Sequence, residues 1–216
     1  VIAQGCRIAG QVCVALGLAL LWGCAGTGEM VSLNVQPQQP FVQSGQPAPL
    51  KIVIEPFEDR RADKTKIGQR THLGGGVTTF NVSGGSPGVT IAEALAEALR
   101  WRGWNRRGWD ARVVQSGVGV SGADIVIGGD ILDFYANAKS RVFNTKLTGE
   151  SRLVIRAKNM ADDSSTQRNL QGEQSKLVFW FTSDDVETLM SGLLQDGIER
   201  FIADTKIEGR ALKSAK

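Results

Sequence analysis

Three long segments in the second half of the chain have the residues of β-strands, the middle one with clean alternation of apolar and polar residues, and they constrain the fold more than any other feature. They cover residues 123–136, 147–157 and 172–181. A period of two is typical of β-strands, because successive side chains point to opposite faces of a sheet. The first segment is apolar on both faces, which favours a central strand with a bulge or bend at Gly128-Gly129. Together the three segments predict an antiparallel meander with one solvated face.

Shorter β-branched runs precede the meander at 51–55, 77–82 and 111–114. Two helices are also expected. The first opens at Ser86-Pro87, repeats apolar residues every four positions and stops at Gly103; the second begins near Ser183 and continues to residue 202. This order of elements predicts an α+β fold, a mixed, mainly antiparallel sheet with two helices packed on one face.

The front of the chain carries an apolar run that ends at a cysteine. Residues 18–25 read LALLWGCA, with Cys24 directly after Gly23. This order resembles a bacterial lipobox, in which the cysteine is acylated and the preceding residues are removed. The run is shorter than the roughly 20 residues of a membrane-spanning helix. It predicts a lipid anchor at Cys24; an ordinary signal peptide or a short membrane anchor is the alternative.

These features divide the chain into four parts. Residues 1–23 are expected to be a signal peptide, and residues 24–49, rich in Gln, Pro, Ser and Gly, a lipidated flexible tether. An edge strand around Val31 to Val35 is the alternative for part of the tether. Residues 50–208 form the expected α+β domain, and residues 209–216 a frayed basic tail.

Composition excludes several classes of function. The chain has a net charge of only +3, so a general polyanion binder is disfavoured, and an envelope address argues against a nucleic-acid partner. His72 is the single histidine, and Cys6 and Cys13 lie in the expected signal peptide, so we expect no metal site and no cofactor. Gly74-Gly75-Gly76 lacks the remaining parts of a phosphate-binding loop. The sequence shows no catalytic constellation and favours a binding protein over an enzyme.

One cluster of basic and aromatic residues stands out between residues 100 and 109. Its members are Arg100, Trp101, Arg102, Trp104, Arg106, Arg107 and Trp109. Interleaved basic and aromatic side chains suit anionic headgroups or glycan strands, so the cluster is a candidate surface binding site. The alternative is that one or two tryptophans belong to the core, while the arginines stay in water at the helix end.

The chain resembles the YajG-type family of uncharacterised bacterial lipoproteins. The matching residues are Cys24, Asp59-Arg60, Ile67-Gly68, the helix ending in Leu99 and Gly103, the run 123–126 and a final helix closing on Asp204. More distantly, the layout is similar to auxiliary lipoproteins of ABC-type lipid transport systems.

The resemblance implies an envelope lipoprotein and brings no catalytic residues. Separately, we expect contact with the membrane through the anchor at Cys24 and a partner that is an envelope protein, a lipid or a glycan. Because Ala25, and not aspartate, follows the cysteine, we expect the protein to be anchored in the outer membrane with its domain facing the periplasm. An accessory role in lipid transport is the alternative function. It would need an apolar groove between sheet and helices, lined by residues such as Leu95, Phe134 and Phe179; a filled core would favour the first reading.

Overall fold

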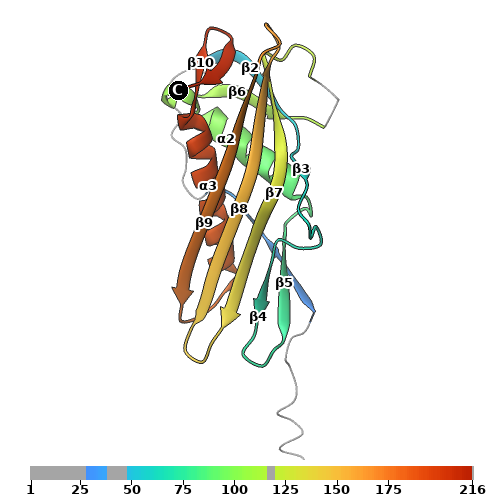
Figure 1. The fold of residues 1–216 in the computed structure, drawn as a ribbon, viewed down its shortest axis with the longest axis vertical. Coiled ribbons are helices and arrows are strands. Elements are labelled where there is room, and N and C mark those ends of the chain that lie inside the picture. The colour runs from blue at the N-terminus through green and yellow to red at the C-terminus, as the bar shows by residue number, and fades with distance from the viewer. Residues whose placement is uncertain (1–27, 38–47, 116–119, 216) are drawn as a thin grey trace, which may run out of the picture.

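A computed structural model describes residues 28–37, 48–115 and 120–215. They form a nine-stranded sheet, a separate two-stranded hairpin and two α-helices (Figure 1). The strands of the sheet are β1 (Glu29–Leu33), β2 (Ala48–Ile54), β3 (Glu58–Asp59), β4 (Gly68–Thr71), β5 (Val77–Val82), β6 (Trp109–Val113), β7 (Ile125–Ser140), β8 (Thr145–Asn159) and β9 (Ser165–Val178). The helices are α2 (Pro87–Trp101) and α3 (Ser183–Ala203), and the hairpin is β10 (Thr205–Glu208) with β11 (Ala211–Ser214).

Strand β7 is the centre of the sheet. One edge of β7 pairs with β8 along nearly its whole length, and the other edge pairs in turn with β2, β3 and β4. β8 then pairs antiparallel with β9. The predicted central strand and the predicted antiparallel meander are therefore both confirmed.

The sheet is mixed, as expected, but it is not mainly antiparallel. Among the described strands, five of the eight pairings in the sheet are parallel: β1–β5, β2–β6, β2–β7, β3–β7 and β4–β7. The three antiparallel pairings are β4–β5, β7–β8 and β8–β9. A period of two identifies a strand without giving the direction of its neighbour. That direction depends on the crossovers, such as the passage from β2 through α2 to β6.

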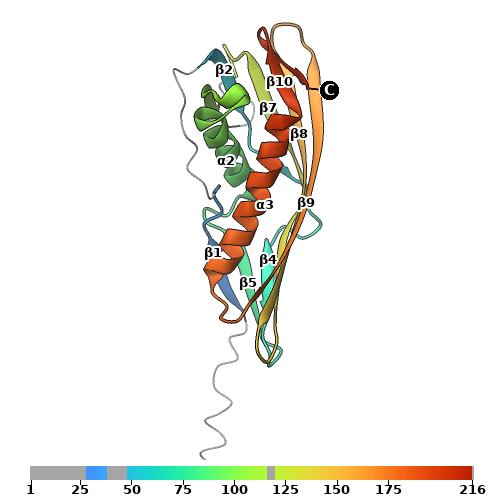
Figure 2. The same cartoon turned by 90° about the vertical axis from the view of Figure 1, so that its left-hand side faces the viewer.

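Both helices lie on the same face of the sheet (Figure 2). α2 begins as predicted, with Pro87 in its first turn and the Ser86 hydroxyl accepting the Val89 N–H at 3.4 Å. α3 begins after Thr182, whose side chain forms a capping box with Asp185. None of the helices in the described ranges has the length and apolar character of a membrane span.

The expected bend at Gly128-Gly129 is not where the register of β7 changes. The irregularity falls between Ile131 and Asp133, opposite β8. Gly129 instead allows a close approach, since a Cβ there would lie 2.7 Å from the Phe57 ring and 2.0 Å from the Val154 carbonyl oxygen. Glycine is therefore needed at this position because the Phe57 ring packs against it, and not because the strand bulges there.

The tether prediction is wrong for residues 29–37. Strand β1 pairs parallel with β5, and Leu33 and Val35 are buried in the main core. Two main-chain N–H groups that follow also bind α3: Asn34 donates to the Glu187 carboxylate at 2.8 Å, and Gln36 donates to the Ser191 hydroxyl at 3.1 Å. The edge-strand alternative is the one observed. Residues 24–27 and 38–47 lie outside the described residues.

The frayed-tail prediction is also wrong for residues 209–215, and Lys216 lies outside the described residues. β10 and β11 pair as an antiparallel hairpin, and Leu212 is fully buried. The buried Asn159 side chain accepts the Leu212 N–H at 2.8 Å and donates to the Leu212 carbonyl at 3.0 Å. Four of the last nine residues are charged, so the composition of this segment is that of an exposed tail. Composition alone does not show that Ala211 and Leu212 are buried against a partner.

Candidate functional site

The basic-aromatic cluster follows the end of α2, and its two later tryptophans belong to the core. Trp104 is 2% exposed and Trp109 is 7% exposed. Their rings meet edge-to-face with centroids 5.7 Å apart, and Trp104 meets Phe201 of α3 at 6.2 Å. The Trp104 indole N–H donates to the Thr205 hydroxyl at 2.8 Å, which satisfies the one polar atom of the buried ring.

The expectation that Trp104 and Trp109 form part of a surface site is therefore wrong. Trp101, at 40% exposure, is the tryptophan of this cluster that reaches solvent. The arginines Arg100, Arg102, Arg106 and Arg107 all lie at the surface, as both interpretations of the cluster required. Helical spacing could not place Trp104, because the helix ends before it and the chain reverses.

The reversal depends on Gly103 and two left-handed residues. Gly103 has φ +26°, and a Cβ there would lie 2.1 Å from the Trp109 ring and 2.5 Å from the Arg107 carbonyl oxygen. Asn105 and Arg106 follow with φ near +58° and +55° in the short turn η2 (Trp104–Arg106). Non-glycine residues seldom adopt this conformation, and it is often found at functional sites.

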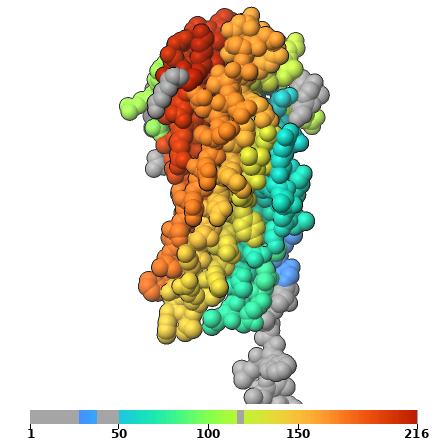
Figure 3. Space-filling model, viewed as in Figure 1, coloured from blue at the N-terminus to red at the C-terminus, as the bar shows by residue number. Residues whose placement is uncertain are grey.

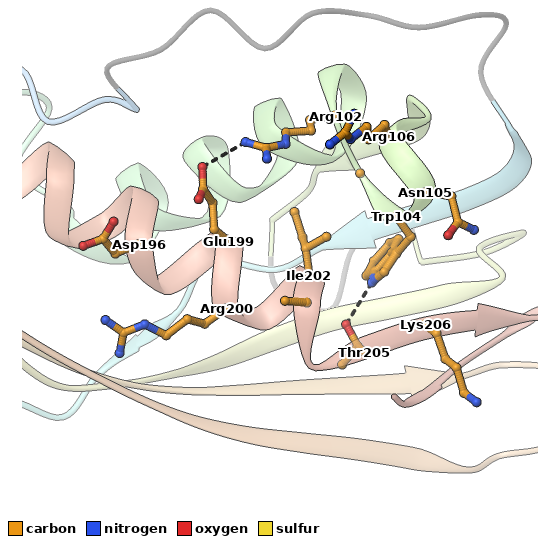
Figure 4. A pocket seen from close by; sticks show the side chains of 12 residues that line it. Arg102, Trp104, Asn105, Arg106, Asp196, Glu199, Arg200, Ile202, Thr205 and Lys206 are labelled. Atoms are coloured by element: carbon orange, nitrogen blue, oxygen red, sulfur yellow. Dashed lines mark hydrogen bonds and ion pairs between the residues drawn. The ribbon is translucent and has the colours of Figure 1, made fainter. Parts of the chain in front are cut away.

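This turn and the end of α3 enclose an open hollow of about 760 Å³ (Figure 4). Its lining comprises Arg102, Gly103, Trp104, Asn105, Arg106, Asp196, Glu199, Arg200, Ile202, Ala203, Thr205 and Lys206. The apolar part comes from Trp104, Ile202 and Ala203, and the charged part from four basic and two acidic side chains. The hollow thus joins the cluster to residues nearly 100 positions later in the chain.

The charges of the hollow are held in exposed, exchangeable contacts. Arg102 pairs with Glu199 at 3.0 Å, with both side chains about 40–50% exposed. Lys206 pairs with Glu208 at 2.7 Å, and Arg200 donates to the Gln171 carbonyl at 2.6 Å. Surface ion pairs contribute about 0–1 kcal/mol each, so an anionic group can displace them at little cost. The hollow is suited to binding a partly apolar molecule or segment with an anionic group.

The residues considered from the sequence for catalysis or metal binding lie away from the hollow in the described part of the chain. Among the described residues, no group of three or more His, Cys, Asp or Glu side chains could hold a metal ion. His72 lies in the β4–β5 hairpin, where its Nε2 is 2.8 Å from the Thr78 hydroxyl. Glu93 and Glu97, one turn apart on α2, are exposed. Gly74-Gly75-Gly76 forms part of the same hairpin turn as His72.

Two acidic residues near β3 and β7 have pKa values below their ordinary range, for structural reasons. The Arg61 guanidinium holds the pKa of Asp59 low through hydrogen bonds at 2.8 and 2.9 Å. Arg156 likewise lowers the pKa of the buried Asp130, because its guanidinium donates hydrogen bonds of 2.6 and 2.7 Å to the two carboxylate oxygens. Arg61 is itself buried and also donates to the main-chain carbonyl of Lys66 at 2.8 Å. These pairs hold the sheet and turn together rather than form a site.

Of the three residues expected to line a lipid groove, Phe179 does not join the other two. Leu95 and Phe134 are fully buried in the main core, whereas Phe179 is highly exposed beyond the end of β9. Their separation removes the observation that would have favoured a lipid-transport subunit. The core between sheet and helices is filled by side chains from both.

No family model matches the sequence, and neither does any curated protein. Several solved structures share its layout. A Xanthomonas campestris protein of family DUF330 has a TM-score of 0.47 at 9% identity, covering 81% of this chain and 91% of its own. A homologue of the neuraminyllactose-binding hemagglutinin from Helicobacter pylori scores 0.42 at 10% identity, covering 81% and 91%.

Lipoprotein GNA1162 from Neisseria meningitidis scores 0.34 at 12% identity, covering 68% of this chain and 97% of its own. At these identities and scores the similarities concern layout and carry no conclusion about activity. The resemblance to the YajG-type family stays a prediction. All three TM-scores lie below 0.5, so these comparisons assign the chain to no family.

Proposed function

We propose that this protein is a lipid-anchored component of the bacterial cell envelope that acts by binding and not by catalysis. The observation that carries the proposal is the position of Cys24 directly after an apolar run and a small residue. The hollow beside Trp104 supplies a binding site, with basic side chains around an apolar floor. Its partner would be an envelope protein, lipid or glycan with an anionic group.

The anchor is tested by replacing cysteines one at a time in the full chain. Cys24→Ala should abolish labelling with radioactive palmitate and leave an unprocessed precursor or a soluble form. Cys13→Ala is the matched control, because it removes a thiol from the predicted signal peptide and should leave labelling intact. Labelling that survives Cys24→Ala would show that the protein is not anchored there.

The membrane in which the protein is anchored is a separate part of the proposal. Because Ala25, and not aspartate, follows Cys24, we propose the outer membrane, with the domain facing the periplasm. Density-gradient separation of the two membranes should place the acylated protein in the outer-membrane fractions. Enrichment in the inner membrane would contradict this address and leave the anchor itself intact.

A further inference from the structure

One end of the molecule carries a cluster of exposed apolar side chains, which we call the apolar tip. Its residues are Leu73, Val142, Phe143, Leu177, Phe179 and Trp180. Phe143 is 81% exposed and Trp180 is 91% exposed. Single exposed apolar residues are ordinary, but several large ones at one end of a domain indicate an interaction surface.

Strand register brings these residues together. Thr71, at the end of β4, pairs with Lys139 near the end of β7, so the β4–β5 and β7–β8 turns lie at the same end. Thr145, at the start of β8, pairs with Val178 at the end of β9, which places residues 179–180 beside the β7–β8 turn. The ends of these strands lie together at the lower end of the molecule in Figures 1 and 3.

The apolar residues at the tip are not needed for the turns that carry them. The β7–β8 turn closes through the Arg141 N–H, which donates to the Asn144 carbonyl at 2.7 Å, with Val142 and Phe143 between them. Such turns favour Gly, Asn and Asp. After β9, Phe181 packs on Phe80 at 6.3 Å, so the two aromatic residues before it extend into solvent from a fixed base.

The N-terminal segment reaches the domain at the same end. The Gly28 N–H donates to the Val77 carbonyl at 3.1 Å, beside the β4–β5 turn. Cys24 precedes Gly28 by four residues, which span at most about 14 Å when fully extended. An acyl chain on Cys24 would therefore hold this end of the domain close to the membrane surface.

We propose that the apolar tip inserts into the bilayer that holds the acyl chains of Cys24. The proposal rests on the lipid anchor of the proposed function. Exposed Lys139, Arg141 and Lys146 border the tip and suit headgroup phosphates. Of the two acids at the nearby start of α3, Asp185 is held by the capping box and by Lys176 at 3.3 Å, and Asp184 is exposed.

The proposal also fixes the orientation of the domain. α3 has 21 residues and starts beside the tip, so it spans about 30 Å from there to the hollow at its other end. Insertion of the tip would present the basic hollow away from the anchoring membrane, toward partners in the surrounding space. Two contacts with the membrane, the acyl chains and the tip, would then restrict how the domain rotates on its anchor.

The test uses the acylated full protein in vesicles of phosphatidylethanolamine, phosphatidylglycerol and phosphatidylcholine brominated on its acyl chains. Bromine quenches an indole that enters the acyl region. Wild-type emission should be quenched, and most of the quenching should disappear in Trp180→Phe. Trp101→Phe is the matched control, because Trp101 is a partly exposed tryptophan at the end of α2 and its loss should leave the quenching unchanged.

A second measurement does not depend on acylation. In the Cys24→Ala background, Phe143→Ser with Trp180→Ser should lower partitioning into the same vesicles about tenfold or more, since two large aromatic contacts are lost. Leu132→Ser with Met160→Ser removes two exposed apolar residues away from the tip and should leave partitioning unchanged. Absence of palmitate on Cys24 would refute the proposed anchor, while this measurement still tests the tip.

Equal quenching in the wild type and Trp180→Phe would overturn the insertion. So would partitioning that is the same in the tip variant and in its control. If the tip instead mediates self-association, sedimentation without vesicles will show an oligomer that the tip variant loses, with no quenching of Trp180. That result would also refute insertion and would assign the tip to a second copy of the chain.

Discussion

Arg61 is a charged residue in the interior of the protein, and Asp59 makes its burial possible. The guanidinium binds both carboxylate oxygens of Asp59 and the carbonyl oxygens of Lys66 and Phe134. A buried cation without such partners would cost several kcal/mol. The network ties the segment after β3 to β7. Sequence analysis does not identify it, because a run of charged residues has the composition of a solvated loop.

The Asp59–Arg61 pair predicts a dependence of stability on pH. The pKa of Asp59 is lower in the folded protein, so its stabilising effect is complete above the unfolded value near 4 and is lost as pH falls through the folded value. Asp59→Asn should lower the free energy of unfolding by about 2–4 kcal/mol at pH 7, because it leaves Arg61 buried without its charge partner.

Urea denaturation at a series of pH values checks this prediction. The difference between wild type and Asp59→Asn should shrink as pH falls below about 4, where Asp59 is first protonated in the unfolded chain and, at still lower pH, in the folded protein. Glu58→Gln is the control, since the Glu58–Arg60 pair is exposed to solvent and should contribute little to stability. A difference that is constant with pH would contradict the assigned role of the pair.

Trp104 supports a second prediction, because its ring joins α2, β6 and α3. Trp104→Ala should cost about 3–5 kcal/mol of stability, since it removes a buried ring and leaves the Thr205 hydroxyl without its donor. Trp101→Ala, at a half-exposed position of the same cluster, should cost about 1 kcal/mol. Similar losses for both variants, measured by thermal unfolding, would mean that Trp104 is not the core residue described above.

Among the elements, β1 departs most from what its composition indicates. It lies in a stretch rich in Gln, Pro, Ser and Gly, yet within it Val31, Leu33 and Val35 recur with a period of two. Leu33 and Val35 enter the core formed by α3 and the sheet. A short strand of this kind has too few residues for its alternation to stand out. It becomes stable because β5 supplies its hydrogen bonds and α3 covers its apolar face.

Removal of a core side chain from β1 should therefore destabilise the whole domain. Leu33→Ala should lower the free energy of unfolding by about 2–5 kcal/mol and the melting temperature by about 5–15 °C. Ser32→Ala, an exposed position of the same strand, should change the melting temperature little. Equal melting temperatures for Leu33→Ala and wild type would restore the view that this segment is only a tether.

At the scale of the whole molecule, two surfaces of different chemistry lie at opposite ends of α3. One end carries the apolar tip and the start of β1, and the other carries the hollow with its basic side chains. Figure 2 shows α3 running along the length of the domain between them. This arrangement separates the proposed membrane contact from the proposed binding site.

The basic side chains around the hollow predict binding that weakens with salt. Replacing Arg102, Arg106 and Arg107 with Ser should lower the yield of partners crosslinked in intact envelopes about tenfold, given up to about 1 kcal/mol for each charge. Stability should change little, because these arginines are exposed. Replacing Arg152, Lys158 and Lys213 with Ser is the matched control. An unchanged yield for the first variant would exclude the hollow as a charged contact.

The amino-acid sequence by itself determined the local elements: the three long strands of the meander, α2 with its Ser86-Pro87 start, α3, and the cysteine after its apolar run. These follow from periodicity and capping, which depend on neighbours in the chain. Tertiary structure decided strand direction, the inclusion of β1 and of the β10–β11 hairpin, the burial of Trp104, and the two surfaces. Each of these depends on contacts between distant residues, such as Trp104 with Thr205 or Thr145 with Val178. A single sequence does not contain such pairings, because many partners would satisfy the same side chain.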